Sequence, residues 1–120
     1  MVENTRDPCF NDWSVLSLDE VEKGVTEGPA AFQLRQAEGL VRYPSGKSAM
    51  VYYAYAHHAK RAILESMQDE IQSPGVRGVG AIWFRTLEHP RALEHLQRLF
   101  VEFERRFGAP PLFNNKAQGT

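Results

Sequence analysis

The segment Ser45–Ser48, with the sequence Ser-Gly-Lys-Ser, has the residue types that bind nucleotide phosphates in a Walker loop. Such a loop also requires a glycine five positions before its second glycine, and Val41 occupies that position. No strong helix start follows the segment, whereas a plain hairpin turn fits it well. We therefore interpret Ser45–Ser48 as a turn rather than as a nucleotide site.

The histidines and the cysteine are poorly spaced for metal binding or nucleophilic catalysis. His57 and His58 are adjacent, so on a helix their side chains would diverge by about 100°. His89 and His95 are six positions apart, which is also unfavourable for gripping one metal ion. Cys9 is the single cysteine, which excludes an internal disulfide bond and a multi-cysteine zinc site.

The order of other groups along the chain is more informative than any of these motifs. Ala30–Phe32 lies in a strand-like segment, Tyr52–Ala54 in a second one, and Arg61 and Asn114 follow. In this order they resemble the GIY-YIG nuclease domain, in which short strands deliver tyrosines, the next helix an arginine and a later helix a metal-binding carboxylate. The resemblance covers about residues 28–114. It implies an α+β fold with a small, mostly antiparallel sheet of about three or four strands, flanked by a pair of main helices.

The resemblance also implies roles for individual residues. Tyr52 would take the tyrosine position of the second motif, or Tyr43 would take it in another register that places this motif on residues 43–46. Arg61 would stabilise charge on phosphate oxygens with its guanidinium, and Asn114 would organise the site by hydrogen bonds. We prefer the register at Tyr52 because Arg61 then follows nine residues later, near the spacing of the family.

Several positions depart from the pattern of the family. Phe32 stands where the first tyrosine is usual and has no hydroxyl that could move a proton, and Ala54 stands in a glycine position. Counting from the apolar pair at 100–101, the metal-binding glutamate position falls on Gln97, whose neutral amide would hold Mg²⁺ weakly. Glu94, one turn earlier, is the alternative ligand for Mg²⁺ or Mn²⁺.

We therefore expect a GIY-YIG-like domain that binds DNA or RNA and has lost, or strongly weakened, its endonuclease activity. The alternatives are an active metal-dependent endonuclease and a protein-interaction module that uses the tyrosine-rich strand. With 14 basic and 15 acidic residues the formal charge is -1, so any contact with nucleic acid must be local. Phosphate contacts and base stacking would come from Lys47, Lys60, Arg61, Tyr53 and Tyr55.

Local signals predict the first elements that position these groups. Ser17–Glu20 has the spacing of a capping box, which predicts a short helix over 18–23 ended by Gly24. The β-prone residues from 30 to 55 are interrupted by turn signals and predict a meander with strands at about 30–36, 40–43 and 49–55.

The segment after the meander permits more than one interpretation. Apolar residues recur at helical spacing from Met50 to Ile71, so one long helix over 49–72 is an alternative to a strand followed by a helix over 57–72. We favour the strand and helix. Gly78–Thr86 predicts another buried strand, and Pro90 is suited to the first position of the last helix. Gly108 can end that helix, whose apolar stripe comprises Leu93, Leu96, Phe100, Phe103 and Phe107.

The 120 residues are enough for one domain, which we place at 13–114, with a flexible arm at 1–12 and a flexible tail at 115–120. No apolar run approaches the roughly 20 residues that cross a bilayer. The first ten residues carry charges where a signal peptide needs an apolar centre. We therefore expect a cytoplasmic protein without a membrane partner.

Overall fold

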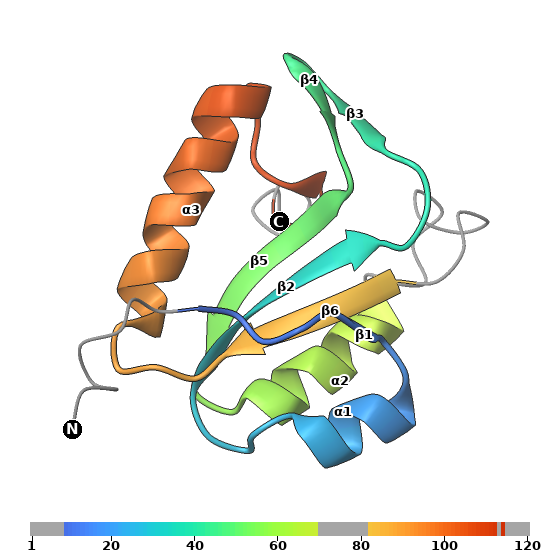
Figure 1. The fold of residues 1–120 in the computed structure, drawn as a ribbon, viewed down its shortest axis with the longest axis vertical. Helices are drawn as coiled ribbons and strands as arrows, with labels where there is room; N and C mark the ends of the chain where they lie inside the picture. Colours follow the sequence, from blue (N-terminus) through green and yellow to red (C-terminus); the bar gives the residue numbers. More distant parts are fainter. Residues whose placement is uncertain (1–8, 70–81, 113, 115–120) are drawn as a thin grey trace.

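A four-stranded antiparallel sheet lies at the centre of the fold, which a computed structural model describes for residues 9–69, 82–112 and 114. Its strands, in spatial order, are β1 (Ser14–Val15), β6 (Ile82–Leu87), β2 (Ala30–Gln36) and β5 (Met50–Ala56). A separate hairpin consists of β3 (Val41–Tyr43) and β4 (Gly46–Ser48). The helices are α1 (Leu18–Gly24), α2 (Ala59–Asp69) and α3 (Ala92–Phe107). The predicted α+β class with a small antiparallel sheet is confirmed (Figure 1).

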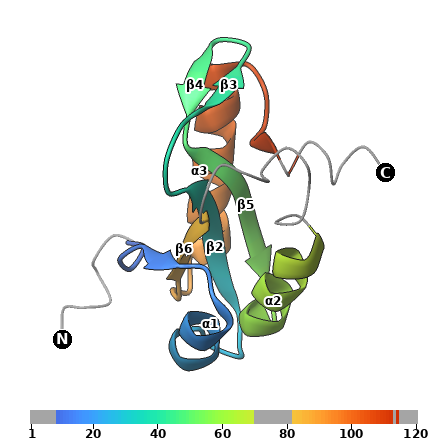
Figure 2. The same ribbon diagram turned by 90° about the vertical axis from the view of Figure 1, so that its right-hand side faces the viewer.

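Side chains on β2 alternate between the faces of the sheet, and each face is covered by different helices. Phe32 packs with Val21 of α1 and Ile63 of α2 in one core cluster. Its neighbour Ala31 packs with Phe103 of α3 in another. Figures 1 and 2 show α3 on one side of the sheet and α1 and α2 on the other. We call these sides the α3 face and the α2 face.

The segment from 40 to 55 differs from the predicted meander. β3 pairs with β4 rather than with the long strands, and β5 pairs directly with β2. The turn at Pro44 and Ser45 contacts the end of α3, where the Ser45 amide donates to the Phe107 carbonyl at 2.9 Å. Gly46 allows the close approach of Phe107, because a Cβ at this glycine would lie 3.3 Å from the ring. The hairpin therefore covers the C-terminal end of α3 instead of extending the sheet (Figure 1).

Residues 49–69 form a strand followed by a helix, as we favoured, and not one long helix. The predicted helix end at 70–72 and the predicted strand start at 78–81 lie outside the described residues. The Ala59 amide donates to the Gly28 carbonyl at 2.9 Å, and the Lys60 amide to the Thr26 carbonyl at 3.1 Å. These bonds satisfy amides that lack partners within the helix and fix the start of α2 to the loop before β2.

The predicted caps at Ser17 and Gly108 are confirmed, but α3 begins at Ala92 rather than at Pro90, which lies in the turn before the helix. Ser17 caps α1, since its hydroxyl accepts a hydrogen bond from the Glu20 amide at 3.3 Å. Gly108 follows α3 in the left-handed conformation, with φ of 83°. The apolar stripe predicted for α3 is wrong at its first residue, because Leu93 is 44% exposed and the neighbouring Ala92 is buried instead.

The domain begins earlier than the sequence predicts. Asn11 falls in the expected arm, but its backbone amide donates to the Thr86 carbonyl at 3.0 Å. Its side-chain oxygen accepts a hydrogen bond from the Thr86 amide at 2.9 Å. Phe10 packs against the core of the α3 face. Residues 1–8 and 115–120 lie outside the described part, and no described helix has the length and apolar character to cross a membrane.

β5 is an outer strand of the sheet, and the side chain of Asn114 takes the place of a further strand beside it. The Asn114 Oδ1 accepts a hydrogen bond from the Tyr53 amide at 2.9 Å. The Asn114 Nδ2 donates to the Tyr53 carbonyl at 2.8 Å. Both backbone groups of Tyr53 would otherwise be open at the sheet edge. Asn114 therefore ties the C-terminal segment to β5.

We expect Asn114→Ala to lower the free energy of unfolding by about 1–2 kcal/mol, since it removes both hydrogen bonds to Tyr53. Urea denaturation followed by circular dichroism measures the change. Asn114→Asp keeps the acceptor for the Tyr53 amide but sets a carboxylate oxygen against the Tyr53 carbonyl, so at neutral pH it should also destabilise the fold. Unchanged stability in the alanine variant would contradict the stabilising role of these two hydrogen bonds.

Candidate functional site

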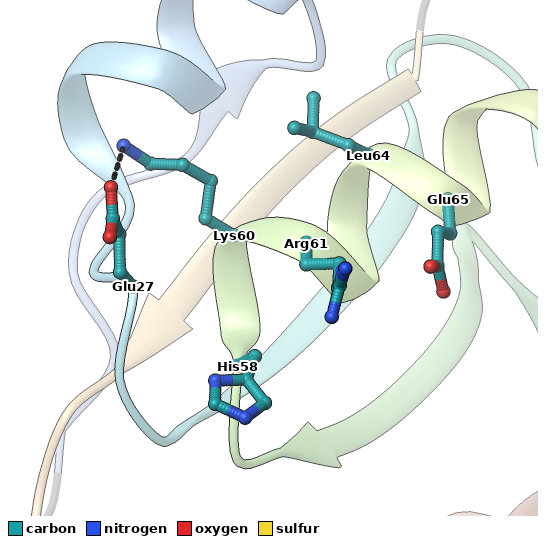
Figure 3. A pocket seen from close by; sticks show the side chains of 6 residues that line it. All are labelled: Glu27, His58, Lys60, Arg61, Leu64 and Glu65. Atoms are coloured by element: carbon teal, nitrogen blue, oxygen red, sulfur yellow. Dashed lines mark ion pairs between the residues drawn. The ribbon is translucent and has the colours of Figure 1, made fainter.

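Arg61 lies in the first turn of α2 and borders a pocket of about 430 Å³. The other lining residues are Glu27, His58, Lys60, Leu64 and Glu65. Figure 3 shows the side chains of His58, Arg61 and Glu65 on the same side of α2, as expected for residues three and four positions apart. The Arg61 side chain is exposed, and none of the described residues forms an ion pair or a hydrogen bond with it.

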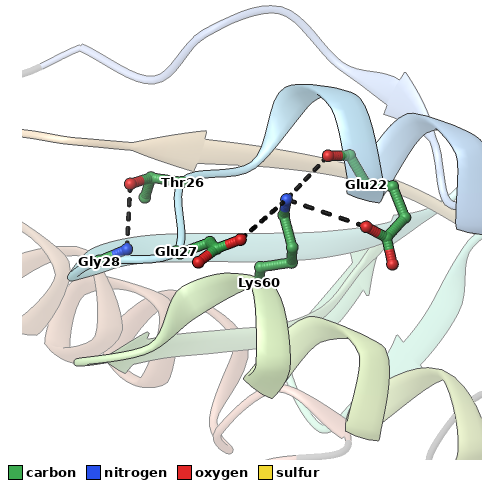
Figure 4. Close-up of polar contacts among 5 residues, drawn as sticks. All are labelled: Glu22, Thr26, Glu27, Gly28 and Lys60. Atoms are coloured by element: carbon green, nitrogen blue, oxygen red, sulfur yellow. Dashed lines mark hydrogen bonds and ion pairs between the residues drawn. The ribbon is translucent and has the colours of Figure 1, made fainter.

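Lys60, predicted to contact nucleic acid, is instead held by α1 and the following loop. Its ammonium donates to the Glu22 carbonyl at 2.8 Å and lies 3.8 Å from a carboxylate oxygen of Glu27 and 4.0 Å from one of Glu22 (Figure 4). Only 18% of the Lys60 side chain is exposed. In the same loop, the Gly28 amide donates to the Thr26 hydroxyl at 3.1 Å. The structure therefore gives Lys60 the role of joining α2 to α1, and its charge is largely neutralised.

Tyr52 lies on the same face of the sheet as α2. It lines a pocket of about 220 Å³ together with Phe32 and residues of α2. The rings of Phe32 and Tyr52 meet edge-on, with centroids 5.8 Å apart. Glu65 borders both this pocket and the one beside Arg61. The structure thus brings Phe32, Tyr52 and Arg61 to adjacent parts of the α2 face.

Tyr43, the tyrosine of the second register, is part of the other core. Its hydroxyl donates to the Met50 carbonyl at 2.7 Å and accepts a hydrogen bond from the Leu112 amide at 3.1 Å. Burial raises the pKa of Tyr43, and the bond from Leu112 opposes this to a lesser degree. A phenol that is buried and engaged in this way joins the hairpin to the C-terminal segment and is a poor proton-transfer group.

The remaining residues predicted to contact nucleic acid are dispersed. Tyr53 is only 8% exposed, and its ring packs against Phe103 of α3, so it has no free face for a base. Tyr55 is half-buried, and its ring meets that of His57 edge-on at 5.7 Å. Lys47 is exposed on the β3–β4 hairpin.

The predicted metal ligands Glu94 and Gln97 are exposed on α3, which covers the opposite face of the sheet from Arg61. The Glu94 carboxylate accepts a hydrogen bond from the Arg91 guanidinium at 3.1 Å. This bond, together with the positive charge of Arg91, lowers the pKa of Glu94. Within the described part of the chain, no three histidine, cysteine, aspartate or glutamate side chains gather to hold a metal ion. The arrangement therefore does not place Arg61 and Glu94 on one phosphate.

Charged neighbours of Tyr53 were not among the residues singled out from the sequence. Burial raises the pKa of Tyr53 to about 12, while Arg85 lowers it and Glu102 adds to the rise. Arg85 comes from β6 and Glu102 from α3, so only the strand register and the helix packing bring them to Tyr53. The alternation of side chains within β6 predicts which face of the sheet Arg85 occupies. It does not predict which strand pairs with β6, and therefore not that Arg85 lies near Tyr53.

Comparison with known proteins adds no functional assignment. No protein family, curated protein or solved structure was found to match this chain. The likeness to the GIY-YIG domain therefore rests on the order of residues in the sequence, and function has to be argued from geometry.

The buried phenol of Tyr53 predicts a loss of stability in alkali. An unfolded tyrosine loses its proton near pH 10, whereas folding raises the pKa of Tyr53 to about 12. The stabilisation is present below pH ~10 and is lost as pH rises through ~12, at a total of about 2–3 kcal/mol. Urea unfolding between these pH values should show the decline.

Tyr53→Phe should remove most of this decline, because phenylalanine does not titrate. Tyr55→Phe removes a phenol from a less buried position on the same strand and is the control. A decline as steep in Tyr53→Phe as in the unmodified protein would contradict the assignment to Tyr53.

Proposed function

We propose that this chain is a GIY-YIG-like domain that binds a nucleic-acid backbone through the α2 face and has lost, or strongly weakened, endonuclease activity. The observation that supports it best is the position of Arg61. Its guanidinium is exposed beside a pocket, next to the strand that carries Tyr52, and has no counter-ion among the described residues. A guanidinium with free N–H groups suits phosphodiester oxygens.

The start of α2 favours the same interpretation. No acidic residue occupies the first turn of this helix, so no carboxylate within that turn offsets the charge of Arg61. The bonds of Ala59 and Lys60 to the loop hold this turn in place, which limits the entropy lost on binding. Glu27 and Glu65 border the pocket and limit how strongly it attracts a polyanion. Weak, salt-dependent binding is the consequence.

The separation of Arg61 from Glu94 and Gln97 supports weakened cleavage. Phosphodiester hydrolysis assisted by a metal requires the cation and the charge-stabilising arginine on the same phosphate. Here the sheet lies between the helices that carry them. Phe32 also lacks the hydroxyl that a proton transfer at its position would need.

Fluorescence anisotropy with labelled single- and double-stranded oligonucleotides, at several salt concentrations, tests binding. We expect Arg61→Ala to weaken it about tenfold and to reduce the slope of log K against log salt by about one. Arg105→Ala, which removes the same charge from the exposed side of α3, should leave binding unchanged. The absence of salt-dependent binding below about 100 μM would refute the proposal.

Incubation of supercoiled plasmid with Mg²⁺ or Mn²⁺ tests the loss of cleavage. We expect no nicking above the level of a preparation that carries Arg61→Ala. Cleavage that is abolished by both Arg61→Ala and Glu94→Gln would instead establish an active endonuclease.

A further inference from the structure

Two arginines lie side by side on the α3 face, away from the site proposed above. Arg85 of β6 pairs across the sheet with Gln33 of β2, and Arg35 of β2 pairs with Trp83 of β6. Arg35 and Arg85 are therefore diagonal neighbours on the same face of adjacent strands. Each guanidinium lies against the ring of Trp13, at 5.2 Å from the ring centroid for Arg35 and 4.4 Å for Arg85.

No carboxylate neutralises this pair within the described part of the chain. Each guanidinium forms one hydrogen bond there, from Arg85 Nε to the Gln33 side-chain oxygen at 2.7 Å and from Arg35 Nε to the Gln36 carbonyl at 3.3 Å. Neither arginine has an ion pair among the described residues. The terminal nitrogens of both groups thus keep donors without a described protein partner.

The surroundings raise the energetic cost of leaving these charges uncompensated. Burial lowers the pKa of Arg85, and the charge of Arg35 lowers it further, whereas Tyr53 and Cys9 oppose the shift. Arg85 also lies over the ring of Phe10 at 4.7 Å, and Arg35 and Trp13 are half-buried. Both arginines help to hold the segment 10–13 on the sheet through Phe10 and Trp13, but an aromatic ring neutralises neither charge. Two like charges that are partly desolvated favour the binding of an anion.

The geometry points to a binding site for a phosphate monoester at Arg35 and Arg85, with Trp13 beside it. A phosphate monoester carries close to two negative charges and three acceptor oxygens, which match two guanidinium forks. A single carboxylate would neutralise only one of them. This site does not depend on the function proposed for Arg61, because it uses other residues on the other face of the sheet.

The fluorescence of Trp13 reports on this site directly. Trp13 and Trp83 are the two tryptophans of the chain, so Trp83→Phe leaves Trp13 as the single reporter. Inorganic phosphate is titrated into this variant at constant ionic strength, with chloride as the reference salt. We expect a saturable change with a Kd of about 1 mM or lower.

Arg35→Gln should raise this Kd at least about tenfold, because one guanidinium fork is lost. Arg35→Lys keeps the positive charge but cannot form two parallel hydrogen bonds, so its phosphate Kd should lie between that of Arg35→Gln and that of the variant with Arg35 intact. Arg42→Gln removes the same charge from an exposed position of β3 and should leave the Kd unchanged. Arg35 is the residue to change first, since its described hydrogen bond is to the neighbouring Gln36, whereas Arg85 also supports Gln33 and the segment 10–13.

A phosphate Kd that Arg35→Gln leaves unchanged would overturn the proposal, as would the absence of saturation up to about 20 mM. Oligonucleotides with a 5′-phosphate or a 5′-hydroxyl, and a nucleoside monophosphate, identify the source of the phosphate. Tighter binding of the phosphorylated oligonucleotide that requires Arg35 indicates a nucleic-acid end, and equal binding of the monophosphate indicates a small molecule. Arg61→Ala should affect neither, so this proposal and the one for Arg61 are tested separately.

Discussion

The alternation of side chains along β2 is the constraint on which the rest of the structure depends. This strand lies between β5 and β6, and its residues Ala31 and Phe32 enter different cores. A shift of one residue in its pairing would exchange the two cores, which would bury Arg35 and expose Leu34. The division also separates the charged residues of the molecule, because side chains from α2 and α3 cannot meet through the sheet. The proposed sites are separate for this reason, since Arg61 lies on the α2 face of the sheet and Arg35 and Arg85 lie on the α3 face.

Side-chain amides complete the edges of this sheet. Asn11 bonds to the backbone of Thr86 beyond the short β1, and Asn114 bonds to the backbone of Tyr53 on β5. Asn114 supplies both the donor and the acceptor from its side-chain amide, whereas Asn11 accepts through its side-chain oxygen and donates from its backbone amide. Because both residues lie near the ends of the described chain, they also fix the terminal segments to the domain. The N-terminal bond matters for the arginine pair, since it holds the neighbouring Trp13 segment against β6.

Much of the fold could be predicted from the sequence, because its signals are local. The helix stripe ending at Phe107, the left-handed Gly108 and the serine cap of α1 each depend on a few consecutive residues. A hairpin turn was predicted at this segment, but the separation of β3 and β4 from the main sheet was missed, since their place is set by contact with the distant Phe107. The candidate site was predicted less well for the same reason. Lys60 lies in the helix where it was expected, but its ammonium pairs with Glu22 of α1 and with Glu27 of the following loop. No local sequence pattern indicates these ion pairs.

The charge of a residue type is therefore a weak guide to binding unless its partners are known. Lys60 and Arg91 are cations whose neighbouring carboxylates are in place. Arg61, Arg35 and Arg85 have no such partner among the described residues, and they occupy opposite faces of the sheet. Among the described residues, carboxylates pair with Lys23, Lys60 and Arg91, and exposed cations such as Lys47 and Arg105 also lack such a partner. A missing counter-ion therefore marks a candidate anion site only together with burial, a like-charged neighbour or an adjoining pocket. Arg35 and Arg85 form the stronger case of the two, because they repel each other and are partly desolvated, whereas Arg61 is exposed to water that already solvates it.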